Sequence, residues 1–225
     1  MDDDVVLSAP LFAGIDPDAS RDLLCSMTPV DLPRGHALFH EGDPGDRLYI
    51  IRSGKVKLGH RSPDGRENLL SVLGPGEMFG ELSLFDPGPR TATATAVADA
   101  RLFELTHREL VKWVDRYPGV VTQLLAALAR RLRRTNETLA DLVFSDVPGR
   151  VAKALLDLSS RFGEPTEDGL RVAHDLTQEE LAQLVGASRE TVNKALADFT
   201  SRGWVRRESR AVVLLDMARL ERRAR

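Results

Sequence analysis

Residues 80–91 read Gly-Glu-Leu-Ser-Leu-Phe-Asp-Pro-Gly-Pro-Arg-Thr, and this stretch carries more information about the chain than any other. Gly80 allows the backbone to come close to a ligand, Glu81 supplies a carboxylate, and an Arg90-Thr91 pair follows a Pro/Gly turn. Amide donors, a carboxylate for a ribose hydroxyl and a guanidinium fork for phosphate oxygens are the groups needed to hold a small phosphorylated sugar. The stretch therefore predicts a pocket for such a ligand.

Short apolar runs separated by glycines surround this stretch, from Leu11 to about Glu109. Strands this short and this regularly interrupted are typical of a closed or rolled antiparallel sheet. The runs are Leu48–Ile51, Lys55–Leu58, Asn68–Leu73 and Arg101–Leu105, and turn-like pairs occur at Ser53-Gly54 and Asp64-Gly65.

A heptad pattern replaces this texture after Thr106. The apolar or small residues step by four and three along one predicted helix, which we expect to end near Phe144. This stripe is narrower than that of an ordinary core helix, so it predicts self-association; packing of one long helix on its own domain is the alternative. The predicted seam consists of Val121, Leu125, Leu128, Leu132, Thr135, Leu139 and Leu142. Ser145–Pro148 offers a cap and a proline for a new helix, and is the expected hinge.

Two further helices and a tight turn are predicted between Thr177 and Phe199. Thr177 and Glu180 form a capping box, and Ser188 after Gly186 can cap a second helix, which together make a helix-turn-helix. The exposed start of the second helix carries Ser188, Arg189, Glu190, Asn193 and Lys194. Arg can bind guanine and Glu can accept from cytosine, so these residues favour DNA reading over a merely solvated charged face.

A small hairpin is predicted after this helix, from Trp204 to Leu214. We expect its tip to carry Arg206, Arg207 and Arg210, as a wing that contacts DNA phosphates; a solvated basic turn is the alternative.

Composition bounds these interpretations. The chain has 225 residues, 42% of them hydrophobic, and a net charge of −3. Residues 147–225 hold 14 Lys+Arg against 12 Asp+Glu, a net of +2, which leaves −5 for the rest and permits nucleic-acid contact at the C-terminal end. Cys25 is the only cysteine and is expected to be buried, and the five histidines lack ligand spacing, so no metal centre is predicted. The acidic start and the lack of long apolar runs indicate a soluble cytoplasmic protein with no membrane partner.

The chain resembles the cyclic-AMP receptor protein branch of the CRP/FNR family of bacterial transcription factors over nearly its whole length. The motifs that carry the resemblance are Gly80-Glu81-Leu82, Arg90-Thr91 and residues 185–192, Val-Gly-Ala-Ser-Arg-Glu-Thr-Val. The resemblance implies an α+β protein with an N-terminal β-roll of the cyclic-nucleotide-binding jelly-roll type, residues 1–116. A dimerisation helix and hinge, residues 117–145, and a winged helix-turn-helix, residues 146–225, would follow.

The resemblance also implies roles for single residues. Gly80, Glu81 and Leu82 would lie at the ribose, Arg90 and Thr91 would hold the cyclic phosphate, and Ala92 would add a backbone amide. Thr135 would bond the adenine amino group, and Asn136 stands where the family has a serine given by the partner subunit. An asparagine can bond adenine, so cyclic AMP is the expected effector. An asparagine also tolerates other bases, so cyclic GMP is less firmly excluded. Lys194 replaces an arginine, so a TGTGA-like half-site would be read less sharply.

The expected function is a cyclic-AMP-responsive, homodimeric transcription regulator at the bacterial nucleoid, with double-stranded DNA and RNA polymerase as partners. One alternative is a ligand-independent architectural DNA-binding protein whose pocket is vestigial or of different specificity. A redox or gas sensor is disfavoured by the single cysteine. An enzyme is not expected, because the sequence shows no nucleophile–base pair and no phosphate-binding Gly-x-x-x-x-Gly-Lys-Ser/Thr loop.

Overall fold

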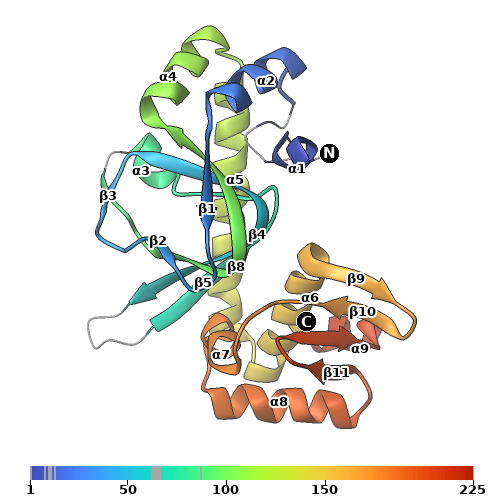
Figure 1. Ribbon diagram of the computed structural model, residues 1–225. Helices are drawn as coiled ribbons and strands as arrows, with labels where there is room; N and C mark the ends of the chain where they lie inside the picture. The colour runs from blue at the N-terminus through green and yellow to red at the C-terminus, as the bar shows by residue number, and fades with distance from the viewer. Residues whose placement is uncertain are drawn as a thin grey trace. The chain divides into compact units, whose positions relative to one another are not determined.

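The computed structural model describes residues 2–7, 9, 12, 14–61, 67–86 and 88–224 (Figure 1). The chain forms two compact units, one of Met1–Arg66 with Leu70–Arg134 and the other of Glu67–Leu69 with Thr135–Arg225. The three-part division expected from the sequence stays a prediction. The turn predicted at Asp64-Gly65 lies outside the described residues.

An antiparallel sheet forms the centre of the first unit, as predicted. Its strands follow the order β1-β8-β4-β5, with β2 also paired to β8 and β6 to β4, while β3 and β7 pair separately. The strands are β1 (Thr28–Leu32), β2 (Ala37–Phe39), β3 (Pro44–Gly45), β4 (Arg47–Arg61), β5 (Glu67–Leu73), β6 (Met78–Phe79), β7 (Gly88–Pro89) and β8 (Thr93–Thr106).

Strand β4 is one long strand where the sequence predicts two short ones with a turn at Ser53-Gly54. Its pairing with β8 continues past these residues, but the register shifts between Ile51 and Val56. Gly54 has φ +81°, and a Cβ there would lie 2.1 Å from the carbonyl oxygen of Asp99. The glycine therefore serves a β-bulge that bends the strand, and the turn expected there is wrong.

Four helices accompany the sheet: α1 (Asp2–Leu7), α2 (Pro17–Ser26), α3 (Leu82–Phe85) and α4 (His107–Arg116). Thr106 ends β8 and caps α4 in a capping box with Glu109, which explains the change of texture at this residue. Helix α2 buries Ala19 and Leu23, whereas Cys25 is exposed. Cys25 follows Leu23 by two residues and so points away from the buried face, and the expected burial is wrong.

Helix α5 (Val120–Phe144) has the extent that the heptad pattern predicts. Its start is buried in the core of the first unit through Val120 and Leu124. Most seam side chains, by contrast, are exposed in the single chain, with Leu125 at 61%, Leu132 at 63% and Leu139 at 56%, while Leu128 is half-buried. None of the described helices combines the length and apolar character needed to cross a membrane.

The second unit contains α6 (Val147–Phe162), α7 (Gln178–Val185), α8 (Arg189–Ser201) and α9 (Met217–Arg223). A four-stranded antiparallel sheet in the order β11-β12-β10-β9 packs with them (Figure 1). Its strands are β9 (Gly163–Thr166), β10 (Gly169–Val172), β11 (Val205–Glu208) and β12 (Ala211–Leu214). Buried residues of α6, α7 and α8, such as Leu155, Leu181 and Phe199, form its core with Val212 of β12.

Asp146 lies in the expected hinge and binds two groups of the second unit. Its side chain accepts a hydrogen bond from the amide of Gly149 at 2.9 Å and so caps α6, and it also pairs with Arg223 of α9. These two donors, Arg223 first, lower the pKa of Asp146 from its ordinary value of 3.8. The cap and the pair thus hold α6 and α9 together when the carboxylate is charged.

We expect Asp146→Ala to lower the free energy of unfolding by about 1 kcal/mol at neutral pH, because a helix cap is lost. Since the folded pKa is depressed, the contribution of Asp146 is present above the ordinary pKa and is lost as the pH falls through the folded value. Urea unfolding of both proteins at descending pH should therefore show a difference that shrinks in acid. Asp157→Ala, an exposed aspartate on α6 that caps nothing, is the control; an equal loss in both variants would contradict the assignment.

Candidate functional site: a buried arginine and a winged helix-turn-helix

The guanidinium of Arg90 is buried in the first unit, and backbone carbonyls hold it. Its Nη1 donates to the carbonyl oxygens of Arg47 at 2.8 Å and of Gly80 at 2.9 Å. The guanidinium carbon lies 4.3 Å from the ring centre of Phe39 and 5.8 Å from that of Tyr49. Carbonyl dipoles and aromatic faces both attract a cation, so they orient the guanidinium without neutralising it.

No carboxylate balances this charge within the described part of the chain. Arg90 is 5% exposed and forms no ion pair there, and its Nε is buried without a hydrogen-bond partner. Burial lowers the pKa of Arg90, while Tyr49 and Asp46 act in the opposite direction. A guanidinium nevertheless stays protonated in proteins. An unbalanced buried cation is costly, and an anion that reached its free edge would be bound strongly.

The backbone conformation at residue 80 and the closeness of Arg90 and Arg47 both favour a glycine there. Its φ is +80°, and a Cβ there would lie 2.8 Å from Nη1 of Arg90 and 3.0 Å from the carbonyl oxygen of Arg47. Gly45 is equally crowded, since a Cβ would lie 2.4 Å from that of Ser83 and 3.1 Å from Cδ of Arg90. The ligand contact expected for Gly80 stays a prediction, whereas the structure shows that its lack of a side chain makes room for the arginine.

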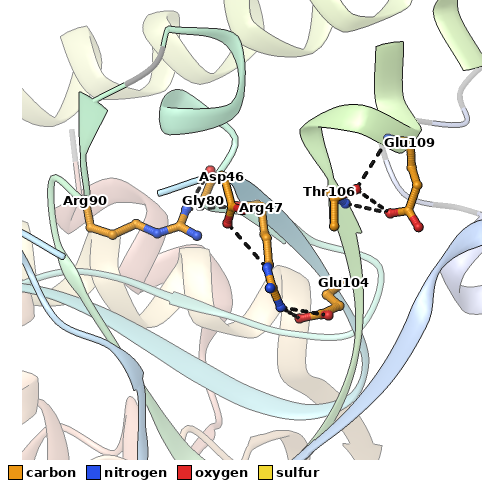
Figure 2. A network of polar contacts seen from close by, with 7 residues as sticks. All are labelled: Asp46, Arg47, Gly80, Arg90, Glu104, Thr106 and Glu109. Carbon is orange, nitrogen blue, oxygen red and sulfur yellow. Dashed lines mark hydrogen bonds and ion pairs between the residues drawn. The ribbon is translucent and has the colours of Figure 1, made fainter. Parts of the chain in front are cut away.

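Arg47 connects this arginine to strand β8 (Figure 2). Nη1 of Arg47 donates to both carboxylate oxygens of Glu104 at 3.0 Å, and Nε lies 3.3 Å from Asp46. The pair with Glu104 raises the pKa of Arg47. Phe39, Arg47 and Tyr49 are not predicted as site residues from the sequence, because their contacts with Arg90 depend on strand pairing between distant segments and leave no local signal.

The other predicted ligand residues of this unit surround the same segment with different exposure. Glu81 is completely buried at the start of α3, and Ala92 is buried. Leu82 is 46% exposed, and Thr91 is exposed. The structure therefore brings Gly80 and Arg90 into direct contact and keeps the rest nearby in the chain.

Thr135 and Asn136 lie on α5 in the second unit, with exposed side chains. Thr135 belongs to the heptad seam, and Asn136 is the next residue. Their expected contact with a nucleotide base stays a prediction.

The predicted helix-turn-helix is confirmed in the second unit. Thr177 and Glu180 form the capping box of α7, Gly186 ends it in the left-handed conformation, and Ser188 caps α8. The inward face of α8 is buried as expected, with Val192, Ala195, Leu196 and Phe199 each at most 5% exposed. The turn is held from α6, because Arg150 donates to the carbonyl oxygens of Val185 at 3.0 Å and Gly186 at 3.2 Å.

The predicted DNA-reading residues lie at the start of α8 on its outer side. Ser188, Arg189, Glu190 and Lys194 are exposed and Asn193 is half-buried. Glu190 and Lys194 form an ion pair at 2.9 Å one turn apart, which is weak because both are exposed. These side chains are free to exchange that pair for contacts with a nucleic acid.

The predicted wing is a hairpin of β11 and β12, but only Arg210 lies in its turn, with φ +56°. Arg206 and Arg207 lie in β11, so their expected place at the tip is wrong. Successive residues of a strand point to opposite faces, and the two arginines accordingly have different partners. Arg206 pairs with Asp168 at 2.7 Å, whereas Arg207 reaches Asn193 of α8.

No cluster of three or more His, Cys, Asp and Glu that could hold a metal ion occurs among the described residues.

Comparison with protein families assigns both units. Residues 29–117 match the cyclic nucleotide-binding domain, and residues 149–223 match the Crp-like helix-turn-helix domain. The first match contains Arg90 with its carbonyl and aromatic partners. The second contains the capped helix-turn-helix and the hairpin.

Individual relatives extend over nearly the whole chain. A CRP-like cAMP-activated global transcriptional regulator of Mycobacterium tuberculosis is 60% identical and covers 99% of this chain and 100% of its own length. The cyclic AMP receptor protein of Thermus thermophilus is 40% identical, with 95% of both chains covered. The solved structure of the c-di-GMP-responsive global regulator CLP of Xanthomonas campestris is 27% identical, with a TM-score of 0.76 over 88% of this chain and 99% of that one.

The names of these relatives describe regulators of gene expression. Because the two domain matches occur in the same order on one chain and the relatives span it almost completely, the protein belongs to the CRP/FNR family of transcription regulators.

Proposed function

We propose that this protein is a cyclic-AMP-responsive regulator that binds DNA as a homodimer. The observation that carries the proposal is the buried guanidinium of Arg90, which is held by carbonyl oxygens and aromatic rings and has no acidic partner among the described residues. A cyclic phosphate is a singly charged anion with two free oxygens, and it matches the fork of a guanidinium.

Other residues of the stretch complete the ligand site in this proposal. Glu81 accepts from the ribose 2′-hydroxyl, Thr91 donates its hydroxyl to the phosphate, and Ala92 adds a backbone amide. Gly80 and Leu82 line the approach to the ribose.

The base is read from α5 in this proposal. Thr135 bonds the adenine amino group, and Asn136, supplied by the partner subunit, bonds the same edge of the base. Asn carries both a donor and an acceptor, so it suits adenine and tolerates guanine. Cyclic GMP is therefore the appropriate comparison ligand for cyclic AMP.

DNA is bound by the second unit. Arg189 donates to guanine, Glu190 accepts from cytosine, and Lys194 contacts a base or a phosphate. Among the wing residues, Arg210 in the turn is the best placed to meet a phosphate, because Arg206 is paired with Asp168. The dimer would place its two recognition helices about 34 Å apart in successive major grooves.

Dimerisation uses the exposed apolar seam of α5, with Val121, Leu125, Leu128, Leu132, Leu139 and Leu142 as its contacts. Uncovered side chains of this size on a regular 3-4 spacing are typical of a two-helix interface. We expect the protein to act at the bacterial nucleoid and RNA polymerase to be a further partner.

Ligand should raise the affinity for DNA. In a titration on a palindromic TGTGA-type site at fixed salt, we expect cyclic AMP to tighten binding by five-fold or more, the range of about 1–3 kcal/mol typical of allosteric coupling. Cyclic GMP and c-di-GMP serve as comparison ligands. Equal affinity with and without any of them would favour the architectural, ligand-independent alternative.

Arg90→Met should weaken cyclic-AMP binding by about 100-fold or more in calorimetry, because two charge-assisted hydrogen bonds are lost. The same variant should leave the unliganded protein as stable as before, or more stable, since methionine fills the space without a buried charge. A purely structural arginine would behave in the opposite way.

Arg101→Ala is the matched control for this measurement. Arg101 belongs to the same sheet and is exposed, with Asp31 3.8 Å away. Its loss should leave the affinity for cyclic AMP unchanged, and unchanged affinity in Arg90→Met would disprove the assigned role.

Leu132→Glu should convert the protein to a monomer, because it buries a charge in the middle of the seam. Sedimentation equilibrium measures the change. Ala140→Glu adds the same charge to an exposed position of α5 outside the seam and should leave the dimer intact. A dimeric Leu132→Glu protein would contradict the proposed interface.

A further inference from the structure

We propose that Arg207 of the wing orients the side-chain amide of Asn193 on the recognition helix, and that Asn193 thereby reads one base pair through its amino group alone. This inference rests on the proposed DNA binding, and it adds a specificity-determining residue and a second residue that positions it.

The contact joins two elements that the sequence treats separately. Nη2 of Arg207 lies 3.4 Å from Oδ1 of Asn193, at the long end of the hydrogen-bond range. Arg207 also lines a small cavity together with His174 and with Leu196 of α8. The wing and the recognition helix are therefore linked through these two polar side chains.

The chemistry of the pair fixes which end of the amide faces outward. A guanidinium has only donors, so the group of Asn193 that faces Arg207 must be the carbonyl oxygen. The amino group then points away from the wing. Asn193 follows Arg189 and Glu190 by four and three residues, so it lies on the same side of α8 as those exposed side chains.

An asparagine held in this way differs from a free one. A free asparagine donates to N7 and accepts from N6 of adenine, which is the usual bidentate contact. With its oxygen turned toward Arg207, Asn193 presents its amino group to the DNA and so acts there as a donor. Guanine offers two acceptors in the major groove and thymine offers one, whereas cytosine presents a donor. The held amide therefore favours guanine or thymine over cytosine, and it loses the special preference for adenine.

The neighbouring arginine lacks this function. Arg206 lies on the opposite face of β11, where Asp168 at 2.7 Å and Glu208 at 3.9 Å hold it. Arg207, by contrast, has no ion pair among the described residues and contacts Asn193 instead. Of these two adjacent arginines, Arg206 therefore binds within the sheet and Arg207 contacts the recognition helix.

The test measures dissociation constants of the full-length dimer, saturated with cyclic AMP, for a set of palindromes in which each half-site position carries all four base pairs. For the wild type we expect one position that favours guanine or thymine. Asn193→Ala should remove the discrimination at that position. Arg207→Ala should shift it toward adenine by about five-fold or more, because the freed amide gains a second hydrogen bond.

Arg219→Ala is the matched control, since Arg219 is an exposed arginine of the same unit near Asp216 on α9. It should leave every preference unchanged. The salt dependence of binding supplies an independent readout, because loss of a phosphate contact lowers the slope by about one and weakens all sequences alike.

A uniform loss of affinity in Arg207→Ala with a reduced salt slope would show that Arg207 contacts a phosphate, and would overturn the inference. An unchanged pattern of base preference would do the same. If the wild type bound no sequence preferentially, both the inference and the proposed DNA-binding function would fail.

Discussion

The placement of one buried positive charge constrains much of the first unit. Arg90 is held by two carbonyl oxygens and lies over two aromatic rings, and no described carboxylate neutralises it. Holding the guanidinium in this position requires a glycine at residue 80, aromatic residues at the end of β2 and near the start of β4, and a fixed position for the start of β4. The pair of Arg47 and Glu104 secures that start against β8. The cost of keeping such a charge in the fold is understandable if an anion completes its coordination.

The second unit depends on a different kind of constraint, namely the satisfaction of helix ends. Thr177, Ser188 and Asp146 each cap a helix, and Arg150 binds the last carbonyl groups of α7. These contacts fix the angle between α7 and α8 locally, so the exposed side of α8 keeps its position. The rigid frame allows weakly paired side chains such as Lys194 to remain available for a nucleic acid.

Local signals account for most of what the sequence predicts correctly. Capping boxes, the Ser188 cap and the heptad spacing depend on residues three or four positions apart, and the structure confirms the helices that they indicate. Predictions failed where distant segments decide. Gly54 has the sequence context of a turn residue, but the pairing of its strand with β8 places it in a bulge. Cys25 was expected to be buried because its neighbours are hydrophobic. Arg206 and Arg207 were both placed at the hairpin tip, although the alternation of side chains along a strand puts them on opposite faces. The partners of Arg90 were missed for the same reason, and the roles of single ligand and DNA residues stay predictions.

The proposed ligand residues belong to two different units of the chain, and this has a consequence for protein engineering. Gly80 lies against Arg90 in the first unit, where a Cβ at residue 80 would lie 2.8 Å from Nη1 of Arg90. Thr135 and Asn136 are exposed on α5 and take no part in that contact. Under the proposed function, a library randomised at Thr135 and Asn136 alone would keep Arg90 in place and vary only the contacts to the base, which would make this protein a starting point for biosensors of other cyclic nucleotides.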